Sequence, residues 1–335
     1  GIRVGDLIME ITTHRAESYV GDSRKPVVRF STDLHEDLGR RDFTVNAMAF
    51  DVVDETLHDP LGGQADLDAR LLRTPLAPEE SFSDDPLRTL RAARFLAGYE
   101  LTAAPGLLEA AGSVAERLRI VSAERIRDEL WRLFALPDPG VGFAFLDEAR
   151  LLPLLLPEVS DRSAEQRAEA FRRSVAAEPV PEVRLAALLL EMPAPELDGR
   201  LRALRLSGEQ RTKVLGLVSA VGRVRERTDD GWSDEAVRRL AASAGDQLAA
   251  TVALATAAGV ATGILQTRLG ALRADGELDD LGPALGGAEV IDLLGLEPGP
   301  DVGEALAWLA DLRFGEGRLD PDEEGRRLVA WWEGR

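Results

Sequence analysis

The 335-residue sequence contains no cysteine and only three histidines. Without cysteine the chain forms no disulfide, no thiolate nucleophile and no cysteine-ligated zinc site, which suits a reducing compartment. It also lacks a membrane-length hydrophobic run, since the apolar stretch Leu185–Leu190 ends at Glu191, well short of the roughly 18 residues that a span needs. No basic segment followed by an apolar one marks a signal peptide. We therefore expect a cytoplasmic protein that contacts no membrane.

Positive charge is scarce as well. The net charge is −19, which excludes broad coating of nucleic acid, because phosphate contacts are made by lysine and arginine. Any RNA-binding surface must therefore be local. Nearly all basic residues are arginines, Lys25 and Lys213 being the exceptions, and arginine binds phosphates and base edges in a bidentate manner.

Hydrophobic residues make up 45% of the chain, enough for roughly two to three domains. The first sixty residues are rich in strand-like runs, and helical spacing of leucine and alanine takes over from about residue 63. We expect an α+β protein, a short sheet followed by a long helical array. Because so small a sheet is a poor domain by itself, we also expect residues upstream to belong to it. The predicted strands are Asp6–Thr13, Pro26–Ser31, and a hairpin of Phe43–Val53 and Glu55–His58 that turns at Asp54.

Three motifs follow in order, namely RRDFTVNA at Arg40–Ala47, DPLGG at Asp59–Gly63 and DDPLRTLRAARF at Asp84–Phe95. They resemble the RRDFTxNA, DPxxGxxD and (E/D)DPxRxLRAxRF signatures of the class II tRNA nucleotidyltransferases (CCA-adding enzymes) and bacterial poly(A) polymerases. The resemblance is strong over residues 5 to 130. It implies the remnant of a nucleotidyltransferase β-sheet head (1–62), then an all-α neck that selects nucleotides (63–138) and a helical body and tail (139–335).

The first motif has the chemistry of a nucleotide site. A fixed arginine holds a triphosphate, while a carboxylate and an amide hydrogen-bond ribose hydroxyls. The resemblance implies that Arg41 and Asp42 contact the nucleotide and that Asn46 helps to distinguish ribose from deoxyribose. The alternative for the motif alone is an ordinary ion pair before a strand.

The third motif has a structural and a functional interpretation. Asp85-Pro86 is a typical helix start, and Arg88 lies one turn along on the same side. A carboxylate beside a guanidinium offers an acceptor and donors for the pairing edge of a base. The resemblance implies that Asp85 and Arg88 act as an amino-acid template for CTP and then ATP.

Arginines recur every third residue along the same predicted helix, at Arg88, Arg91 and Arg94. Three guanidiniums on one ridge can clamp a triphosphate by position and charge. The alternative is a solvated charged face, and beside Asp85 we favour phosphate binding.

A fourth segment, ERIRDEL at Glu124–Leu130, resembles the family's ERIxxEL motif. Arg125 and Glu129 have the spacing of an i,i+4 ion pair, and Ser122 is a plausible helix cap. We predict a brace for the template helix and no catalytic role.

The resemblance also implies two Mg²⁺ ions, held by clustered carboxylates, that activate the RNA 3′-hydroxyl and hold the triphosphate. The family's GGxVRD turn and D-x-D strand are not found in these residues. Glu10, in a segment that resembles E(V/I)TTxR, is the one candidate catalytic carboxylate, and an ordinary surface role fits it equally well. We therefore expect this polypeptide alone to be inactive or nearly so.

The helical half resembles an HD phosphohydrolase domain without its ligands. Arg184–Glu191 (RLAALLLE) matches RLAALLHD, with Leu190-Glu191 in place of the His-Asp metal ligands, and no histidine follows His58. We expect a helical fold after residue 140, either HD-like or purely tail-like, that builds no HD metal site.

Basic residues of this half are densest between residues 202 and 227, where we predict contact with the tRNA backbone; a charged helix surface is the alternative. The candidates are Arg202, Arg205, Arg211, Lys213, Arg223, Arg225 and Arg227.

The leading function is CCA addition, the transfer of CMP and AMP from CTP and ATP to the 3′ end of tRNA. Poly(A) polymerase is the nearest rival, although Asn46–Asp51 look like the CCA-adding form. CC-only or A-only addition stays open. A different class of function is a non-catalytic RNA-binding helical module with a vestigial head.

Overall fold

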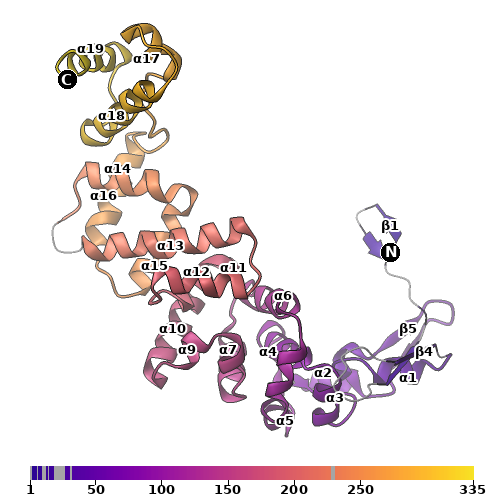
Figure 1. Cartoon of the computed structure of the whole chain (residues 1–335). Helices are drawn as coiled ribbons and strands as arrows, with labels where there is room; N and C mark the ends of the chain where they lie inside the picture. Colours follow the sequence, from indigo (N-terminus) through magenta and orange to yellow (C-terminus); the bar gives the residue numbers. More distant parts are fainter. Residues whose placement is uncertain are drawn as a thin grey trace. The chain divides into compact units, whose positions relative to one another are not determined.

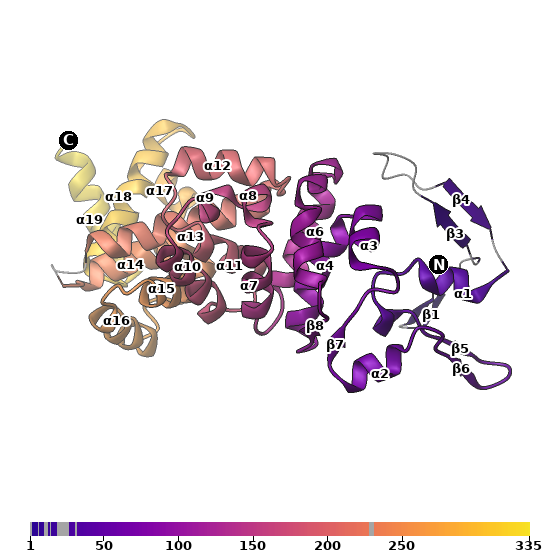
Figure 2. The ribbon, with the colours of Figure 1, turned by 90° about the horizontal axis from the view of Figure 1, so that it is seen from below.

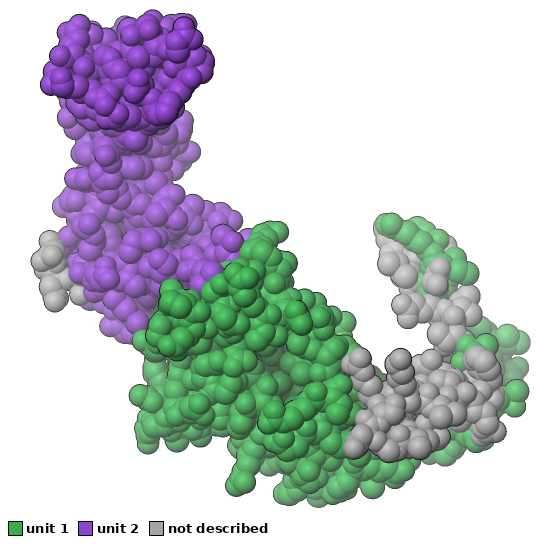
Figure 3. All heavy atoms as spheres, in the orientation of Figure 1, with its two compact units in different colours: residues 1–211 green, residues 212–335 purple. Residues whose placement is uncertain are grey.

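The computed structural model describes residues 2–5, 7–9, 13, 15–18, 27–30, 32–227 and 231–335. The chain forms two compact units, Gly1–Arg211 and Thr212–Arg335, which are coloured separately in Figure 3. Short strands occupy the beginning of the first unit and helices form the rest of both (Figure 1).

The described strands form four pairs. Three are antiparallel: β1 (Ile2–Val4) with β2 (Leu7–Met9), β3 (Arg15–Ser18) with β4 (Val27–Phe30), and β5 (Ala49–Asp51) with β6 (Thr56–His58). The fourth pair, β7 (Leu71–Leu72) with β8 (Thr102–Ala103), is parallel. β2 and β4 fall inside the strand-like runs that the sequence predicts.

The predicted hairpin is present, but its first strand is shorter than expected. Residues Thr44–Asn46 form a 3₁₀ turn, η1, and β5 begins only at Ala49. The cause is a set of contacts that hold Thr44 away from a partner strand: its amide donates to the Arg73 carbonyl (2.9 Å) and its hydroxyl to Asp66 Oδ2 (2.7 Å). The hairpin turn is stabilised by Asp51, whose Oδ1 accepts the amide protons of residues 53 and 54.

Several helices of the first unit pack around α4, whose predicted apolar positions Leu87, Leu90, Ala93 and Leu96 are all buried. Helix α4 lies against α6 and α7 (Figure 2). Gly142 of α7 makes that approach possible, because a Cβ there would stand 2.8 Å from the Ala93 carbonyl oxygen. The helices of residues 34–148 are α1 (Leu34–Gly39), α2 (Gly63–Asp68), α3 (Pro78–Asp84), α4 (Leu87–Gly98), α5 (Leu107–Ser113), η2 (Ala115–Ile120), α6 (Ala123–Phe134) and α7 (Gly140–Glu148).

A buried arginine of α11 (Pro181–Leu188) joins this helix to the end of α6. Arg184 is 1% exposed, and its guanidinium donates to the carbonyls of Phe134 (2.9 Å), Leu136 and Pro137 (2.8 Å), just where α6 ends. These carbonyls would otherwise be buried without partners. The next helices of the first unit are α8 (Leu152–Leu155), α9 (Pro157–Ser160), α10 (Ala164–Ala176), α11 (Pro181–Leu188) and α12 (Ala194–Ala203).

The second unit is entirely helical in its described residues. Its last three helices share one apolar core, centred on Val290, Leu309 and Leu328. No described helix of the chain has the length and apolar character to cross a membrane. The helices are α13 (Gly208–Glu226, which begins in the first unit), α14 (Asp234–Ala244), η3 (Gly245–Gln247), α15 (Leu248–Ala257), α16 (Gly263–Ala274), α17 (Gly287–Leu294), α18 (Pro300–Glu316) and α19 (Pro321–Glu333).

Candidate active site

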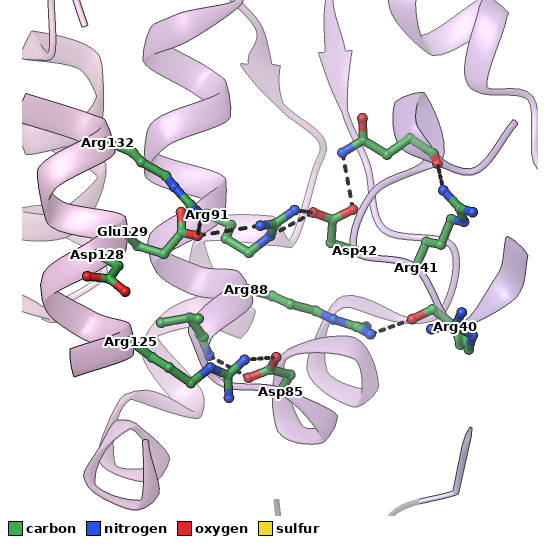
Figure 4. A pocket seen from close by; sticks show the side chains of 12 residues that line it. Arg40, Arg41, Asp42, Asp85, Arg88, Arg91, Arg125, Asp128, Glu129 and Arg132 are labelled. Carbon is green, nitrogen blue, oxygen red and sulfur yellow. Dashed lines mark hydrogen bonds and ion pairs between the residues drawn. The ribbon is translucent and has the colours of Figure 1, made fainter. Parts of the chain in front are cut away.

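A pocket of about 710 Å³ lies in the first unit, where the RRDFTVNA segment meets the start of α4 and one face of α6 (Figure 4). It brings together predicted nucleotide-binding residues from two separate sequence motifs. These are Arg41, Asp42 and Asn46 of RRDFTVNA and Asp85, Arg88 and Arg91 of DDPLRTLRAARF. Six arginines and four acidic residues line it, so the pocket is strongly polar and carries net positive charge. The lining residues are Arg40, Arg41, Asp42, Asn46, Asp85, Leu87, Arg88, Arg91, Arg125, Asp128, Glu129 and Arg132.

Asp42 joins the first motif to the third. Its Oδ1 accepts hydrogen bonds from the Phe43 amide (2.9 Å) and from Asn46 Nδ2 (3.2 Å). Its Oδ2 accepts from Arg91 Nε (2.8 Å) and Nη2 of α4. The Asp42 carboxylate is therefore fixed in place, and with it the position of Asn46.

Arg41 is held more loosely than its neighbours. Its Nη1 donates to the Asn46 carbonyl at 3.1 Å, its Nη2 lies 3.6 Å from Asp37, and its side chain is 43% exposed. An exposed ion pair of this length contributes little to stability. Arg41 can thus turn to an anionic ligand at low cost.

Asp85 and Arg88 both line the pocket, and each has partners of its own. Helix α4 begins one residue later than the Asp85-Pro86 pair predicts, with Pro86 as its N-cap, but Asp85 Oδ1 still accepts the Leu87 amide at the helix start (3.2 Å). Arg88 is 7% exposed, and its guanidinium donates to Ser81 Oγ (2.7 Å) and to the Arg40 carbonyl. Asp85 and Arg88 are thus held in place by separate protein contacts rather than by an ion pair with each other.

The buried carboxylate of Glu129 accepts hydrogen bonds from three arginines. It is 3% exposed and accepts from Arg94 Nε (2.9 Å), Arg132 Nη1 (2.6 Å) and Arg91 Nη1 (3.4 Å). Burial by itself would lower the pKa of Arg91, but Asp42 and Glu129 outweigh it and raise that pKa. The Arg91 guanidinium is thus a fixed, permanently charged group at the pocket wall.

One local prediction for α6 was wrong. Arg125 does not pair with Glu129: its Nη2 binds Asp85 Oδ2 at 2.9 Å, because the Glu129 carboxylate is taken by Arg91, Arg94 and Arg132. Ser122 is the N-cap residue of α6, as predicted, although its side chain makes no cap hydrogen bond.

Sequence reasoning placed Arg94 with the nucleotide ligands. In the structure it is not among the residues that line the pocket; it binds Glu129, and its guanidinium carbon lies 4.7 Å from the centre of the Phe95 ring. Contact of Arg94 with a nucleotide stays a prediction.

Sequence reasoning also missed one wall of the pocket. Arg125, Asp128, Glu129 and Arg132 recur at helical spacing along α6 and line the same cavity. Residues at this spacing share one face of a helix, so the sequence alone could have predicted this charged wall.

The described carboxylates of the pocket do not fit a site for two magnesium ions. Asp42 and Glu129 are engaged by arginines, and Asp85 is engaged by Arg125. Among the residues that the structure describes, no group of three or more histidine, aspartate or glutamate side chains is placed to hold a metal. Glu10, the candidate catalytic carboxylate, lies outside the described residues.

The HD-like segment contains an ion pair where relatives are expected to hold a metal. Glu191 accepts from Arg173 Nη1 at 3.2 Å, and the Arg173 side chain is 6% exposed. Leu190 beside it is buried.

The predicted RNA-binding residues are in part engaged with acidic side chains. Arg202 and Arg211 both bind Asp198 (2.9 and 3.1 Å), and Arg205 lies 3.7 Å from Glu124. The hydrogen bond from Arg202 and that from Arg211 outweigh burial and lower the pKa of Asp198. In the second unit, Arg223 donates to two serine hydroxyls. A role in RNA binding stays a prediction for all seven residues.

Comparison with known proteins identifies the family. Residues 1–73 match the model of the poly A polymerase head domain, and residues 101–162 match that of a probable RNA- and SrmB-binding site of polymerase A. An A-adding tRNA nucleotidyltransferase of Deinococcus radiodurans is 32% identical over 93% of this chain and 82% of its own length. The chain belongs to the tRNA nucleotidyltransferase family.

Two further comparisons support this family assignment. The CCA-adding enzyme of Geobacillus stearothermophilus is 32% identical, over 96% of this chain and 78% of its own length. The crystal structure of the Bacillus stearothermophilus CCA-adding enzyme in complex with CTP matches with a TM-score of 0.71 at 27% identity, covering 97% of this chain and 79% of that one. The predicted family and the predicted α+β fold class are thereby confirmed.

Proposed function

We propose that this chain selects the nucleotides that are added to the 3′ end of tRNA, with CTP and ATP as its substrates. The observation that carries the proposal is the convergence of the RRDFTVNA, DDPLRTLRAARF and ERIRDEL segments on one polar, arginine-lined pocket. The known CTP complex of a relative that matches along nearly the whole chain supports a nucleotide as the occupant.

Each group of side chains has a proposed task. Asp85 and Arg88 offer an acceptor and donors to the pairing edge of the base. Arg41 and Arg91 hold the triphosphate by charge and position, and Arg94 supports them through Glu129. Asp42 and Asn46, which are hydrogen-bonded to each other, face the ribose.

We propose CCA addition as the complete activity, since CCA-adding enzymes recur among the relatives. A-only addition is the second candidate, because the Deinococcus radiodurans relative that covers 93% of this chain is an A-adding enzyme. In both cases tRNA is the acceptor. Arg202, Arg205, Arg211, Lys213, Arg223, Arg225 and Arg227 are the proposed contacts to its backbone.

Magnesium, which the family resemblance implies, is proposed to be held by carboxylates other than those of the described pocket. When bound, it supplies activation of the acceptor hydroxyl and charge neutralisation at the phosphates. We therefore propose that the polypeptide of these 335 residues binds nucleotides without appreciable turnover, and that residues 1–62, 63–138 and 139–335 act as head remnant, neck, and body with tail.

Calorimetric titration of the full chain with CTP, ATP, UTP and GTP tests nucleotide selection. We expect CTP and ATP to bind about tenfold or more tightly than UTP and GTP, since a correct pair of base-edge hydrogen bonds discriminates by about 1–3 kcal/mol. Arg88→Ala should remove the preference, and Arg172→Ala, which alters an exposed residue far from the pocket, should leave it unchanged. Equal affinity for all four nucleotides would contradict the proposal.

An incorporation assay separates the two candidate activities. Labelled CTP and ATP are offered with Mg²⁺ to tRNA that ends before CCA and to tRNA that ends in CC. This polypeptide should transfer neither nucleotide measurably, and clear turnover would refute the proposal that it binds without reacting. If turnover is found, incorporation of ATP alone, on the CC-ended tRNA alone, identifies an A-adding enzyme.

A further inference from the structure

The last part of the chain is far more acidic than the rest. Residues 275–335 contain 16 acidic residues, five arginines and no lysine, so their net charge is −11 out of −19 for the whole protein. A surface of this charge repels phosphate groups. The three helices of this region, α17, α18 and α19, therefore carry a strong excess of negative charge.

These helices carry an apolar groove. It has a volume of about 1050 Å³ and lies between α17 and α19, with Leu285, Leu293, Val329 and Ala330 among its lining residues. Leu293 is 45% exposed although it belongs to a helix with a buried core face. α17 and α19 face each other here, since a Cβ at Gly325 would be in van der Waals contact with Leu293 Cδ2 (3.4 Å).

The rim of the groove is acidic. Glu289, Asp292, Asp322 and Glu333 line it, and Arg326 is the one basic residue among its described lining. Arg326 is itself occupied by Glu323, at 2.5 Å.

The remaining arginines of the region do little to neutralise the rim. Three of them bind acidic residues elsewhere, namely Arg313 with Glu277, Arg327 with Glu316 and Glu323, and Arg335 with Glu304. Ion pairs to the rim residues Glu289, Asp292 and Glu333 are not found among the residues that the structure describes. The rim therefore keeps a negative potential beside an exposed apolar floor.

We infer that the groove docks a basic amphipathic helix of a protein partner. A helix of this kind would place leucine-like side chains on Leu293 and Val329 and direct lysine or arginine to the acidic rim, as in other helix-in-groove complexes. The eight residues of α17 are about 12 Å long at 1.5 Å per residue, so two to three turns of the partner span the groove. An exposed apolar patch with a polar rim is typical of an interaction site.

The same charges argue against two other occupants. RNA would bring its phosphates against Glu289, Asp292 and Glu333, with the only rim arginine already paired. A second copy of this chain would bring a region of net charge −11 against its equal, and like charges across an interface are unfavourable. A cationic, amphipathic partner has neither conflict.

Calorimetry with the full chain and a defined probe tests the inference. The probe is a 14-residue synthetic peptide with leucine at helical i, i+3, i+4 and i+7 spacing and lysine elsewhere; its control is a peptide of equal composition with the leucines scrambled. We expect the amphipathic peptide to bind about tenfold or more tightly than the scrambled one. Leu293→Gln, and separately the double change Asp292→Lys with Glu333→Lys, should each weaken binding by about tenfold or more.

Matched variants elsewhere in the second unit serve as controls. Ile264→Gln removes an equally exposed apolar residue of α16 (57% exposed), and Asp301→Lys reverses an exposed charge of α18; neither should change binding. Circular dichroism checks that all variants are folded. The probe contains no nucleotide, so this result is independent of the proposed nucleotide selection.

Three outcomes would overturn the inference. One is peptide affinity that Leu293→Gln leaves unchanged. Another is self-association in sedimentation that Leu293→Gln abolishes, which would make a second copy the occupant. The third is loss of tRNA affinity in Leu293→Gln, which would assign the groove to RNA.

Discussion

Arg125 of α6 binds Asp85 at the start of α4, with 2.9 Å between Nη2 and Oδ2. The two side chains are 43% and 25% exposed, so water screens the pair and its contribution to stability is small. The other carboxylate oxygen of Asp85 accepts the Leu87 amide. One oxygen is thus fixed by the backbone, while the other is held by a partner that a ligand can displace.

That difference gives a prediction for base selection. Asp85→Ala should reduce the preference for CTP over UTP by about tenfold or more, because the acceptor for the base's amino group is removed. Arg125→Ala should change the preference by less than about threefold, since the amide of Leu87 still orients Asp85. Calorimetric titration with both nucleotides measures it, and equal losses in the two variants would show that Arg125 itself reads the base.

The second prediction concerns Gly63, which links the DPLGG motif to the RRDFTVNA motif. A Cβ at Gly63 would stand 2.3 Å from the Thr44 carbonyl oxygen, a backbone atom that cannot move without moving η1. Gly63→Ala should therefore weaken nucleotide binding as well as reduce stability, by about 1–3 kcal/mol. Gly39→Ala, where a Cβ meets nothing within 4 Å, is the control in thermal unfolding and titration. A variant as stable as the control would refute the close approach.

Arg184 should be among the most costly residues of the first unit to replace. Arg184→Ala leaves several buried carbonyls without donors, and we expect a decrease of about 3 kcal/mol or more in the free energy of unfolding. Denaturant titration measures it against Arg172→Ala, which removes an exposed i,i+3 pair with Glu169 and should cost under about 0.5 kcal/mol. Similar midpoints for the two variants would contradict the role.

The lowered pKa of Glu277 predicts how the stability of the second unit depends on pH. Burial by itself would raise its pKa, but hydrogen bonds from Arg313 and the Arg318 amide, with the charge of Arg238, lower it below 4.5. A carboxyl group with a lowered folded-state pKa stabilises the protein above its unfolded pKa, and that stability is lost as pH falls through the folded pKa.

Glu277→Gln should therefore destabilise the second unit at pH 7 and flatten the fall in stability below about pH 4.5. Thermal unfolding between pH 3 and pH 7 measures this. The control is Glu297→Gln, an exposed residue of the same acidic region, which should keep the acid-dependent fall. If the stability of Glu277→Gln fell with pH in parallel with that of the unaltered protein, Glu277 would not be the group that links stability to pH.

Arg223 and Arg225 near the end of α13, and Arg227 just after it, should contribute to the salt dependence of tRNA binding. Reversing charge at Arg223, Arg225 and Arg227 should weaken tRNA binding and flatten its dependence on salt, by about 0.7–0.9 of slope for each phosphate that is no longer neutralised. Filter binding over a range of salt measures both quantities. Reversal of Arg326, which is paired in α19, should leave the slope unchanged. Unaltered slopes in the triple variant would end the proposal for this helix.

Local signals predicted the local parts of the fold. Asp85-Pro86 marked the beginning of α4, and the leucine spacing after it identified the buried face. The same rules failed where a distant residue intervened. The i,i+4 rule assigned Arg125 to Glu129, but α4 supplies Arg91 and Arg94 to that carboxylate from 38 and 35 positions away. The spacing of residues along α6 does not reveal that arginines of another helix compete with Arg125 for Glu129.

The pocket shows a similar division. Its nucleotide-facing motifs were recognisable one by one, and their meeting depends on contacts such as Asp42 with Arg91, 49 residues apart. The first hairpin strand was predicted to begin at Phe43, yet Arg73 and Asp66 capture Thr44 and form a 3₁₀ turn instead. Both features arise from tertiary partners, which no local pattern encodes.

The four carbonyls bound by Arg184 also decide where this chain can be divided. They belong to Phe134, Leu136 and Pro137 at the end of the neck and to Ala177 after α10, so the proposed boundary between residues 138 and 139 cuts through a single hydrogen-bonded cluster. A neck released at that boundary would expose the ends of α6 without donors. The end of α6, whose other face lines the pocket, is thus stabilised by a residue of α11, so we expect substitutions at Arg184 to disturb nucleotide binding from a distance.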